Sequence, residues 1–393
     1  MRSNYKKLGD YIRPVDDRNS DLSVTNLQGV SITKEFVPSI ANIIGTDLSK
    51  YKIVRTGQFA YGPVTSRNGE KVSIALLKDK DCIISSSYSP FEIYKTNELL
   101  PEYLMLWFMR SEFDRYARFM SNGSAREVFD WDSMCAVEIP VPPLAEQHKI
   151  VWDYQVITDR IGLLQKLIDK LEEYTKTIYK SFFETFDMFS GVCPETISTT
   201  KISSLPIEVT DFVANGSFAD LRNNVTLYDE ENYAYYVRNT DLKNNCYSKY
   251  VDEQSYQFLS KSFLAGGEVI ISNVADVGSV FLCPHLDKPM TLGSNVIMLR
   301  SSHNQWSYFM YLYFKFFMGK RQIVEITTGS AQPKFNKTAF RGIEGLFPAQ
   351  SVLEEFNNKV RPVFDQMDRC SAEMRVLKAL SKAHIGSMSF KGA

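Results

Sequence analysis

The sequence offers few residues that could hold a metal ion or build a disulfide framework. Its six cysteines lie far apart, at positions 82, 135, 193, 246, 283 and 370, and no two form a Cys-x-x-Cys pair. Only Cys283 and His285 have a spacing that metal ligands use, and two groups do not make a zinc site. Scattered cysteines are typical of a reducing compartment. We therefore expect neither a structural metal nor a disulfide scaffold.

Long apolar segments are also missing. The N-terminal segment, MRSNYKKLGDYIRPVDDRN, contains no apolar core of a secretion signal. The longest aromatic-rich run, Trp306 to Phe314, has nine residues, which is less than half of the roughly 20 that a membrane-spanning helix needs. We expect a cytoplasmic protein that does not contact a membrane.

The motifs of several enzyme classes are absent. There is no phosphate-binding G-x-x-x-x-G-K-[ST] loop and no G-x-G-x-x-G fingerprint. The one Pro-Pro pair, Pro142-Pro143, follows a valine, so the Asn-Pro-Pro-Tyr motif that amino-methyltransferases use on a flipped base is missing. No proline precedes an aspartate, as the PD-(D/E)xK nucleases require. We expect no catalytic residues in this chain.

A surplus of positive charge is missing too. The chain has 45 basic and 46 acidic residues, a net charge of −1. Because nucleic-acid binding draws much of its affinity from phosphate contacts, this balance does not by itself indicate a nucleic-acid partner. The content of hydrophobic residues, 44%, and of charged residues, 23%, is that of a globular protein. A length of 393 residues suffices for two or three domains.

What the sequence does contain is an internal repeat. Residues 123–187 align without gaps to residues 329–393, at an offset of 206. Both segments open with Gly-Ser-Ala, and Phe129 matches Phe335. Self-similarity at a fixed distance indicates two copies of one structural unit.

Both copies continue with apolar residues at alternating steps of four and three. This spacing is that of the a and d positions of a left-handed coiled coil, and it predicts two long helices that pair along one seam. Each series carries a hydroxyl at the same place, Thr175 and Ser381. The predicted seam consists of Ile150, Tyr154, Ile157, Ile161, Leu164, Ile168 and Leu171 in the first helix, and Phe356, Val360, Val363, Met367, Cys370, Met374 and Leu377 in the second.

Prolines mark the predicted helix boundaries. The proline-bearing stretches 139–147 and 346–355 suit helix starts, and Gly191 and Pro194 would end the first helix. Pro362, inside the second helix, should kink it or mark a later start. The expected order is a globular domain at 1–143, a helix at 144–187, a globular domain at 188–348 and a helix at 349–393.

The two globular segments have mixed patterns that favour an α+β fold. The strand-like runs are Cys82–Ile84, Tyr233–Val237, Glu268–Ile271 and Val296–Leu299, and the helix-like runs are Pro101–Phe119 and Gln305–Lys320. Gly57-Gln58-Phe59 and Gly267-Glu268-Val269 occupy equivalent places in the two copies.

This arrangement resembles the specificity (S) subunit of type I restriction–modification systems. The resemblance is carried by IPVPPLAEQHKIV at 139–151, which runs into the first long helix, and by NGSAREVF at 122–129. In the second copy it is carried by YVRNTDLKN at 236–244 and TGSAQPKFNKTAF at 328–340. The second copy departs from the pattern, because Pro348-Ala349-Gln350 replaces Pro-Pro-Leu.

The resemblance implies a fold and a division of labour. Two mixed α/β target recognition domains in tandem would each be followed by a long helix, and the helices would pair as an antiparallel coiled coil with pseudo-two-fold symmetry. Each domain would read one half of a bipartite site in double-stranded DNA. Two methyltransferase (M) subunits, which bind S-adenosylmethionine, and restriction (R) subunits, which use ATP and Mg and join through the M subunits, would perform the catalysis. This chain itself would need no cofactor.

Polar residues in turn-like segments are the candidates for DNA contacts, since Arg, Lys, Asn and Gln read base edges and phosphates. Interpretations without DNA contact remain open for these residues. They are solvated loops, a structural Gly-Ser turn, and a buried salt bridge between Arg238 and Asp241. The candidates are Arg67, Asn68, Lys71, Ser124 and Arg126 in the first copy, and Arg238, Asn239, Gln332 and Lys334 in the second.

Two other functions are compatible with parts of the sequence. The chain could be a coiled-coil scaffold that joins two protein-binding modules without DNA. It could also be the recognition part of a single-chain methyltransferase–nuclease, which the missing motifs disfavour. Retention of DNA by the chain together with an M subunit would separate the first alternative from the specificity subunit.

Overall fold

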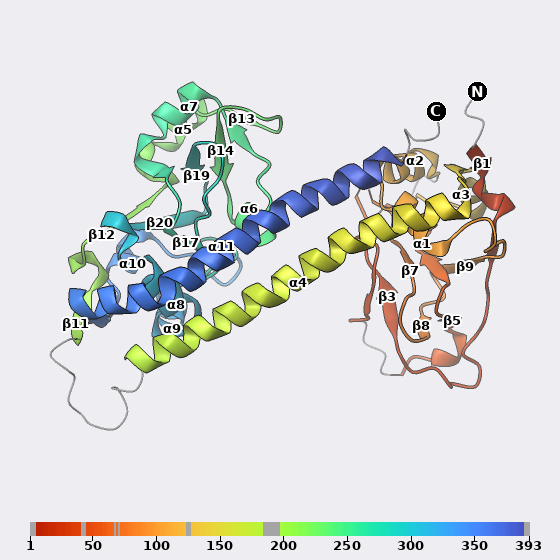
Figure 1. Ribbon diagram of the computed structural model, residues 1–393, viewed down its shortest axis with the longest axis horizontal. Coiled ribbons are helices and arrows are strands. Elements are labelled where there is room, and N and C mark those ends of the chain that lie inside the picture. The colour runs from red at the N-terminus through yellow and green to blue at the C-terminus, as the bar shows by residue number, and fades with distance from the viewer. Residues whose placement is uncertain are drawn as a thin grey trace. The chain divides into compact units, whose positions relative to one another are not determined.

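The computed structural model describes residues 5–40, 45–66, 68–69, 71–122, 127–183 and 197–388 (Figure 1). The chain forms two compact units. Unit 1 contains residues 1–161 and 377–393, and unit 2 contains residues 162–376. In the described ranges, no helix combines the length and the apolar character that crossing a membrane requires.

Unit 1 is built on a four-stranded antiparallel sheet with the order β2-β9-β6-β7. The rings of Phe59 and Phe91 stack at 4.9 Å on this sheet, and Phe108 of the covering helix α1 meets Phe59 edge-on at 5.9 Å. All three rings are fully buried, so they anchor the helix layer to the sheet. The elements are β2 (Ile12–Pro14), β6 (Phe59–Tyr61), β7 (Ile74–Leu76), β9 (Ser89–Ile93), α1 (Pro101–Phe108) and α2 (Ser111–Met120).

In the described part of unit 1, three small antiparallel pairs and a short helix accompany this sheet. The pairs are β1 with β10, β3 with β4, and β5 with β8. Their bounds are β1 (Tyr5–Lys7), β3 (Gln28–Val30), β4 (Phe36–Pro38), β5 (Lys52–Val54), β8 (Cys82–Ile84) and β10 (Glu138–Pro140), and the helix is α3 (Trp131–Cys135).

Unit 2 repeats this plan. Its sheet has the order β12-β20-β17-β18, it is antiparallel throughout, and α8 and α9 follow it as α1 and α2 follow the sheet of unit 1. β11 pairs with β21 as β1 pairs with β10. The elements are β11 (Ile197–Lys201), β12 (Ile207–Asp211), β17 (Val269–Ser272), β18 (Val280–Leu282), β20 (Val296–Ser301), α8 (Ser307–Phe316), α9 (Met318–Ile326), α10 (Lys337–Arg341) and β21 (Glu344–Pro348).

The sequence repeat is therefore a repeat of structure. Asp130 caps α3 by accepting a hydrogen bond from the Ser133 N–H at 2.7 Å. Asn336, which lies 206 positions later, caps α10 by accepting from the Ala339 N–H at 2.8 Å. The same kind of cap at the same offset places both short helices at the same point of the fold.

Unit 2 also carries an enlarged second sheet with the order β13-β15-β14-β19-β16, and three extra helices lie around it (Figure 1). One of them, α5, follows β12, whereas residues 15–27 after the equivalent β2 contain no helix. The elements are α5 (Phe218–Asn224), β13 (Leu227–Tyr228), β14 (Ala234–Val237), α6 (Asn239–Asn244), β15 (Tyr250–Val251), α7 (Glu253–Phe258), β16 (Phe263–Leu264) and β19 (Met290–Leu292).

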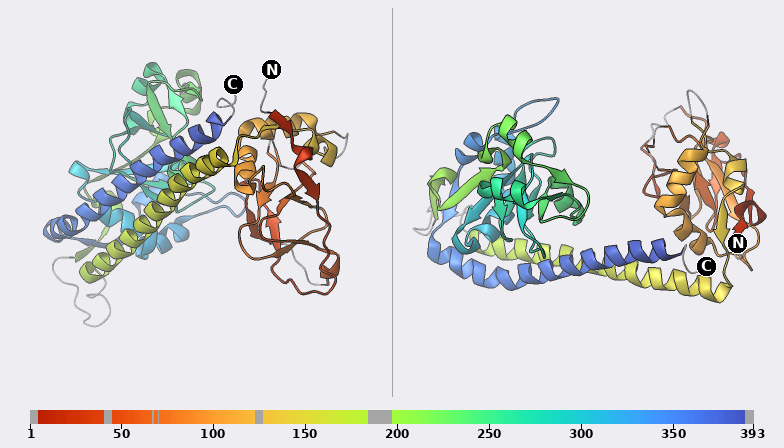
Figure 2. Two further views of the ribbon diagram at one scale, coloured as in Figure 1. Left: turned by 45° about the vertical axis from the view of Figure 1, so that its right-hand side comes forward. Right: turned by 90° about the horizontal axis from the view of Figure 1, so that it is seen from above.

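Two long helices, α4 (Leu144–Phe183) and α11 (Gln350–Ser387), pack side by side in opposite directions (Figure 2). In unit 1 the start of α4 meets the end of α11, where His384 Nε2 lies 3.0 Å from the Ile150 carbonyl oxygen. In unit 2 the end of α4 meets the start of α11, where the rings of Phe182 and Phe356 lie 5.6 Å apart. The α+β fold with an antiparallel helix pair is thus confirmed.

The residues of the expected seam are all buried or half-buried in these helices. Thr175, the polar exception, is fully buried and donates its hydroxyl hydrogen to the Glu172 carbonyl at 2.7 Å, which satisfies the group inside the seam.

The prediction of a later start at Pro362 is wrong, because α11 begins at Gln350 and runs through the proline. Pro362 lies on the exposed side of the helix, where water can satisfy the carbonyl that loses its donor. Gly191 and Pro194, the expected end of the first helix, lie outside the described residues.

Candidate nucleic-acid interface

In unit 2, two loops far apart in sequence are joined by backbone pairing. The β17–β18 loop meets the segment between α9 and α10 through a bridge from Val274 to Lys334. The Ala275 N–H donates to the Pro333 carbonyl at 2.9 Å beside it. Lys334 also pairs with Thr328, so this second segment doubles back as a narrow hairpin. The candidates Gln332 and Lys334 therefore lie on a braced hairpin.

A glycine makes the tip of this hairpin possible. Gly329 has a φ of +88°, and a Cβ on it would lie 2.8 Å from the Gln332 carbonyl oxygen. A side chain at position 329 would suffer both strain and a clash with the backbone. The Gly-Ser-Ala signature of the second copy is thus at least in part a structural turn.

Unit 1 shows the same pair of loops. The β6–β7 loop meets the segment between α2 and α3 through a bridge from Val64 to Val128, and the Thr65 N–H donates to the Glu127 carbonyl at 2.9 Å. Asn122 pairs with Val128 as Thr328 pairs with Lys334, again 206 positions apart. The structure therefore brings together the two segments of the first copy that hold candidates.

The candidate residues of unit 1 differ in how available their side chains are for contact with DNA. Lys71 is exposed, whereas Asn68 is half-buried and its amide donates to the Val64 carbonyl at 3.4 Å within the turn. Lys71 is therefore the better group for a phosphate or a base. Arg67, Ser124 and Arg126 lie outside the described residues.

Arg238 is engaged inside unit 2. Its guanidinium donates two hydrogen bonds to Asp241, from Nε at 2.9 Å and from Nη2 at 2.7 Å. The Asp241 carboxylate is almost fully buried, and its hydrogen bonds raise the pKa of Arg238. The salt bridge that competed with DNA contact as an interpretation of Arg238 is the arrangement observed.

Asn239 braces the β17–β18 loop. Its amide donates to Asp276 of that loop at 2.9 Å, and Lys243 approaches the same carboxylate at 2.9 Å. The hydrogen bond from Asn239, ahead of those from Lys243 and Ser279, lowers the pKa of Asp276. The segment RNTDLKN thus holds the β17–β18 loop in place through these contacts with Asp276.

Gln332 and Lys334 are exposed on the hairpin, and no ion pair or side-chain hydrogen bond engages either of them in the part of the chain that the structure describes. A free amide and a free ammonium on a rigid backbone can contact base edges and phosphates. Sequence reasoning missed the β17–β18 loop itself. The equivalence of Gly57 and Gly267 was the signal that could have found it, because the loop follows the strand that Gly267 introduces.

Groups for metal or thiol chemistry are scarce around these loops. The described residues contain no cluster of three or more His, Cys, Asp or Glu side chains that could hold a metal ion. Burial raises the pKa of the Cys82 thiol to about 12, and burial also raises the pKa of Cys283. Both thiols therefore remain protonated and unreactive at neutral pH.

Both units have the same fold, and each contains two loops that are joined by backbone pairing. Each unit also includes part of the long helix pair. Two such units in one chain define a class of tandem recognition proteins. A family model described as the type I restriction modification DNA specificity domain matches residues 19–173 and 208–349, which is more than half of the chain. The chain belongs to this family of type I restriction–modification DNA specificity proteins.

Known relatives agree with this assignment. The specificity subunit of the type I restriction enzyme MjaIX from Methanocaldococcus jannaschii is 23% identical over 304 residues, which cover 74% of this chain and 69% of the relative. The specificity subunit of the HindI enzyme from Haemophilus influenzae is 19% identical over 83% of this chain and 84% of its own. A crystal structure of a type I S subunit from M. genitalium shares the fold, with a TM-score of 0.56, 13% identity, and coverage of 98% of this chain and 95% of that one.

Proposed function

We propose that this chain is the DNA-recognition subunit of a type I restriction–modification complex, and that each unit reads one half of a bipartite site. The observation that carries the proposal is the duplicated loop pair, which occupies equivalent positions in both units of a chain that belongs to the DNA specificity family. Two equivalent reading surfaces in one chain suit two half-sites on duplex DNA.

The charge of the chain shapes how it would bind. With a net charge of −1, the chain has no surplus with which to neutralise many phosphates. We infer that its partners supply much of the phosphate contact, while Lys71, Gln332 and Lys334 supply selective contacts. Selectivity needs only a few such groups at groove edges.

The proposed partners are two M subunits, with R subunits that join through them. An exposed apolar stripe on α4 supports docking of another protein. Within unit 2, Leu163, Leu167 and Tyr174 are 60%, 42% and 56% exposed, and their spacing of four and seven residues places them on one face of the helix. Apolar side chains aligned in this way are typical of a face that another helix covers.

The catalytic chemistry would belong to those partners. We infer that S-adenosylmethionine binds to the M subunits, that ATP and Mg bind to the R subunits, and that this chain has neither methyltransferase nor nuclease activity. The missing sequence motifs support this division. The complex would act in the cytoplasm, where DNA and the cofactors meet.

The test is co-expression with a candidate M subunit. We expect the complex to retain duplex DNA that carries one particular bipartite sequence and to release a scrambled duplex. Calorimetry of the chain alone should detect no S-adenosylmethionine binding, and a dissociation constant near 1 μM, about −8 kcal/mol, would contradict the division of labour. A complex that forms but never retains DNA would indicate a protein scaffold instead.

A further inference from the structure

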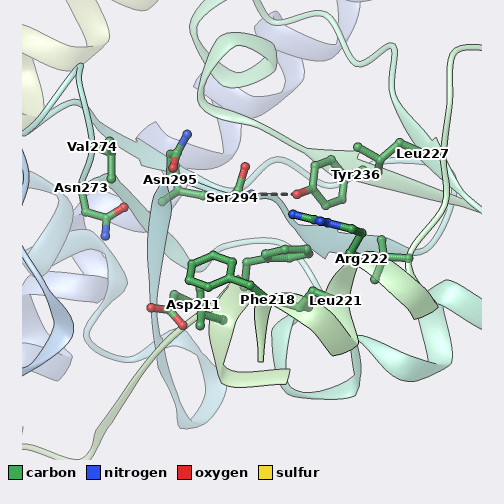
Figure 3. Close-up of a pocket in the computed structure, with 14 residues that line it drawn as sticks. Asp211, Phe218, Leu221, Arg222, Leu227, Tyr236, Asn273, Val274, Ser294 and Asn295 are labelled. Atoms are coloured by element: carbon green, nitrogen blue, oxygen red, sulfur yellow. Dashed lines mark hydrogen bonds between the residues drawn. The ribbon is translucent and has the colours of Figure 1, made fainter. Parts of the chain in front are cut away.

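A pocket of about 490 Å³ lies in unit 2 next to the loop pair (Figure 3). Its walls come from the end of β12, from α5, from β14, and from the β17–β18 loop through Asn273 and Val274. Val274 is the residue that bridges to Lys334, and Asn273 accepts the backbone hydrogen bond of Phe335 at 3.1 Å. The pocket is therefore continuous with the surface that we propose contacts DNA.

The mouth of the pocket is unusually apolar for a solvent-facing surface. Phe218, the first residue of α5, is 75% exposed, and Val213 and Leu227 are also exposed. An aromatic ring that remains open to solvent at the rim of a cavity is suited to stacking against a planar ligand. Because α5 has no counterpart after β2 in unit 1, this wall is particular to unit 2.

A polar side chain with unused hydrogen-bonding capacity lines the same space. Arg222, in the last turn of α5, has no ion-pair or hydrogen-bond partner among the described residues. In Figure 3 its side chain extends from α5 toward Tyr236 and Ser294, which are joined by a hydrogen bond of 2.9 Å from the Ser294 N–H to the Tyr236 hydroxyl.

We infer that this pocket binds an unstacked guanine base of the half-site that unit 2 reads, an inference that rests on the proposed function. A base that stays in the duplex presents only its edge in a groove, whereas a concave pocket can receive a base only after it leaves the stack. The ring of Phe218 supplies a stacking face. The guanidinium of Arg222 matches the O6 and N7 acceptors of guanine.

The first experiment maps methylation by the complex of this chain with its M subunits. The wild-type map gives the two half-sites, and Arg222→Ala should remove a guanine preference at one position of one half-site only. Binding of the specific duplex should weaken about tenfold to a hundredfold, the usual effect of losing one bidentate base contact. The matched control is Asn223→Ala, because Asn223 is an exposed neighbour on α5 that does not line the pocket.

Thermal melting of both variants should match the wild type, since both side chains are exposed. An unchanged methylation motif in Arg222→Ala overturns the pocket inference and leaves the proposed function intact. A wild-type complex that binds DNA without sequence preference overturns both together.

The second experiment tests whether the base leaves the stack. A 2-aminopurine placed beside the implicated guanine should brighten severalfold when the wild-type complex binds, because it loses a stacking neighbour. Phe218→Ala should reduce that increase. Unchanged fluorescence in the wild type means that the base is read within the groove and overturns the inference.

Discussion

At the scale of single residues, the most demanding arrangement is a buried lysine in unit 1. The side chain of Lys34 is 6% exposed, and its ammonium lies 2.8 Å from the Asp114 carboxylate. It also donates to the Phe108 carbonyl and faces the ring of Phe113 at 5.2 Å. Burial lowers the pKa of Lys34, while Asp114 opposes that shift. The β3–β4 hairpin is thereby fastened to α2 through one charged pair.

Replacing Asp114→Asn should destabilise unit 1, because the Lys34 ammonium would stay buried without its counter-ion. The expected cost is about 3–5 kcal/mol at pH 7. The cost should shrink as the pH rises toward 10, since the folded state of the variant prefers neutral Lys34 and the unfolded chain then also gives up its proton. Denaturant unfolding at both pH values measures this. The double change Lys34→Met with Asp114→Asn should recover much of the stability, and a cost that is independent of pH would contradict the explanation.

Residue types alone predicted the candidate site only in part. The sequence showed that Arg238 and Asn239 are polar and turn-like, but not that Asp241 and Asp276 already engage them, because the choice of partner depends on the fold. No pattern in the sequence indicated Arg222 as a candidate residue. Its position beside the loops arises from a helix that the first copy lacks, so no comparison between the copies could indicate it.

At the scale of elements, the helix pair was the most predictable part. Its 4–3 spacing is a local property, so the sequence alone reveals it. The pairing of Val274 with Lys334 joins residues 60 positions apart, and no local pattern encodes such a contact. The strands themselves were also recognisable, as β8 at Cys82–Ile84 illustrates.

Phe356 tests the contribution of the seam within unit 2. It is fully buried and its ring lies near those of Tyr179, Phe182 and Phe183 at 5.1–6.2 Å. Phe356→Ala should lower the free energy of unfolding by about 3–5 kcal/mol, because it leaves a cavity among aromatic rings. Val376→Ala on the same helix is the control. Its side chain is exposed, and its cost should stay within about 0.5 kcal/mol. Equal melting of the two variants would mean that the seam contributes little.

The exposed stripe on α4 should matter for assembly and not for folding. Leu163→Glu combined with Leu167→Glu places two charges on a face that we propose an M subunit covers. Co-purification with M should fall at least tenfold, while the melting temperature of the chain alone stays near the wild-type value, because both side chains are exposed. Gln165→Glu, an exposed change that adds negative charge on another side of the helix, should leave assembly unaffected. Normal co-purification of the double variant would move the docking surface elsewhere.

At the scale of the whole molecule, we propose that the helix pair sets the spacer between the half-sites. Adding one heptad to each helix, after Ile161 and before Leu377, keeps the 3.5-residue register of the seam. The seven residues add about 10 Å at ~1.5 Å each, or about three base pairs at ~3.4 Å each. Methylation mapping should show a spacer longer by about three base pairs and unchanged half-sites.

The control for this prediction is a heptad in α4 alone, which disrupts the pairing and should give no single defined spacer. A change in the segment Glu184–Gly191 would be less informative, since it lies outside the described residues. If both insertions leave the original spacer, the helices act as a tether and not as a measure of distance.

The way in which unit 1 closes has a consequence for synthesis on the ribosome. Its core includes Ile150 from the start of α4 and Met388 from the far end of the chain. Translation proceeds at about 5–20 residues per second. Ile150 therefore leaves the ribosome many seconds before Met388 does. During that interval the apolar face around Ile150 has no α11 segment to cover it, and it is available to chaperones. A prematurely terminated chain would keep that face uncovered, so the cell could distinguish unfinished copies from finished ones before any copy reaches DNA.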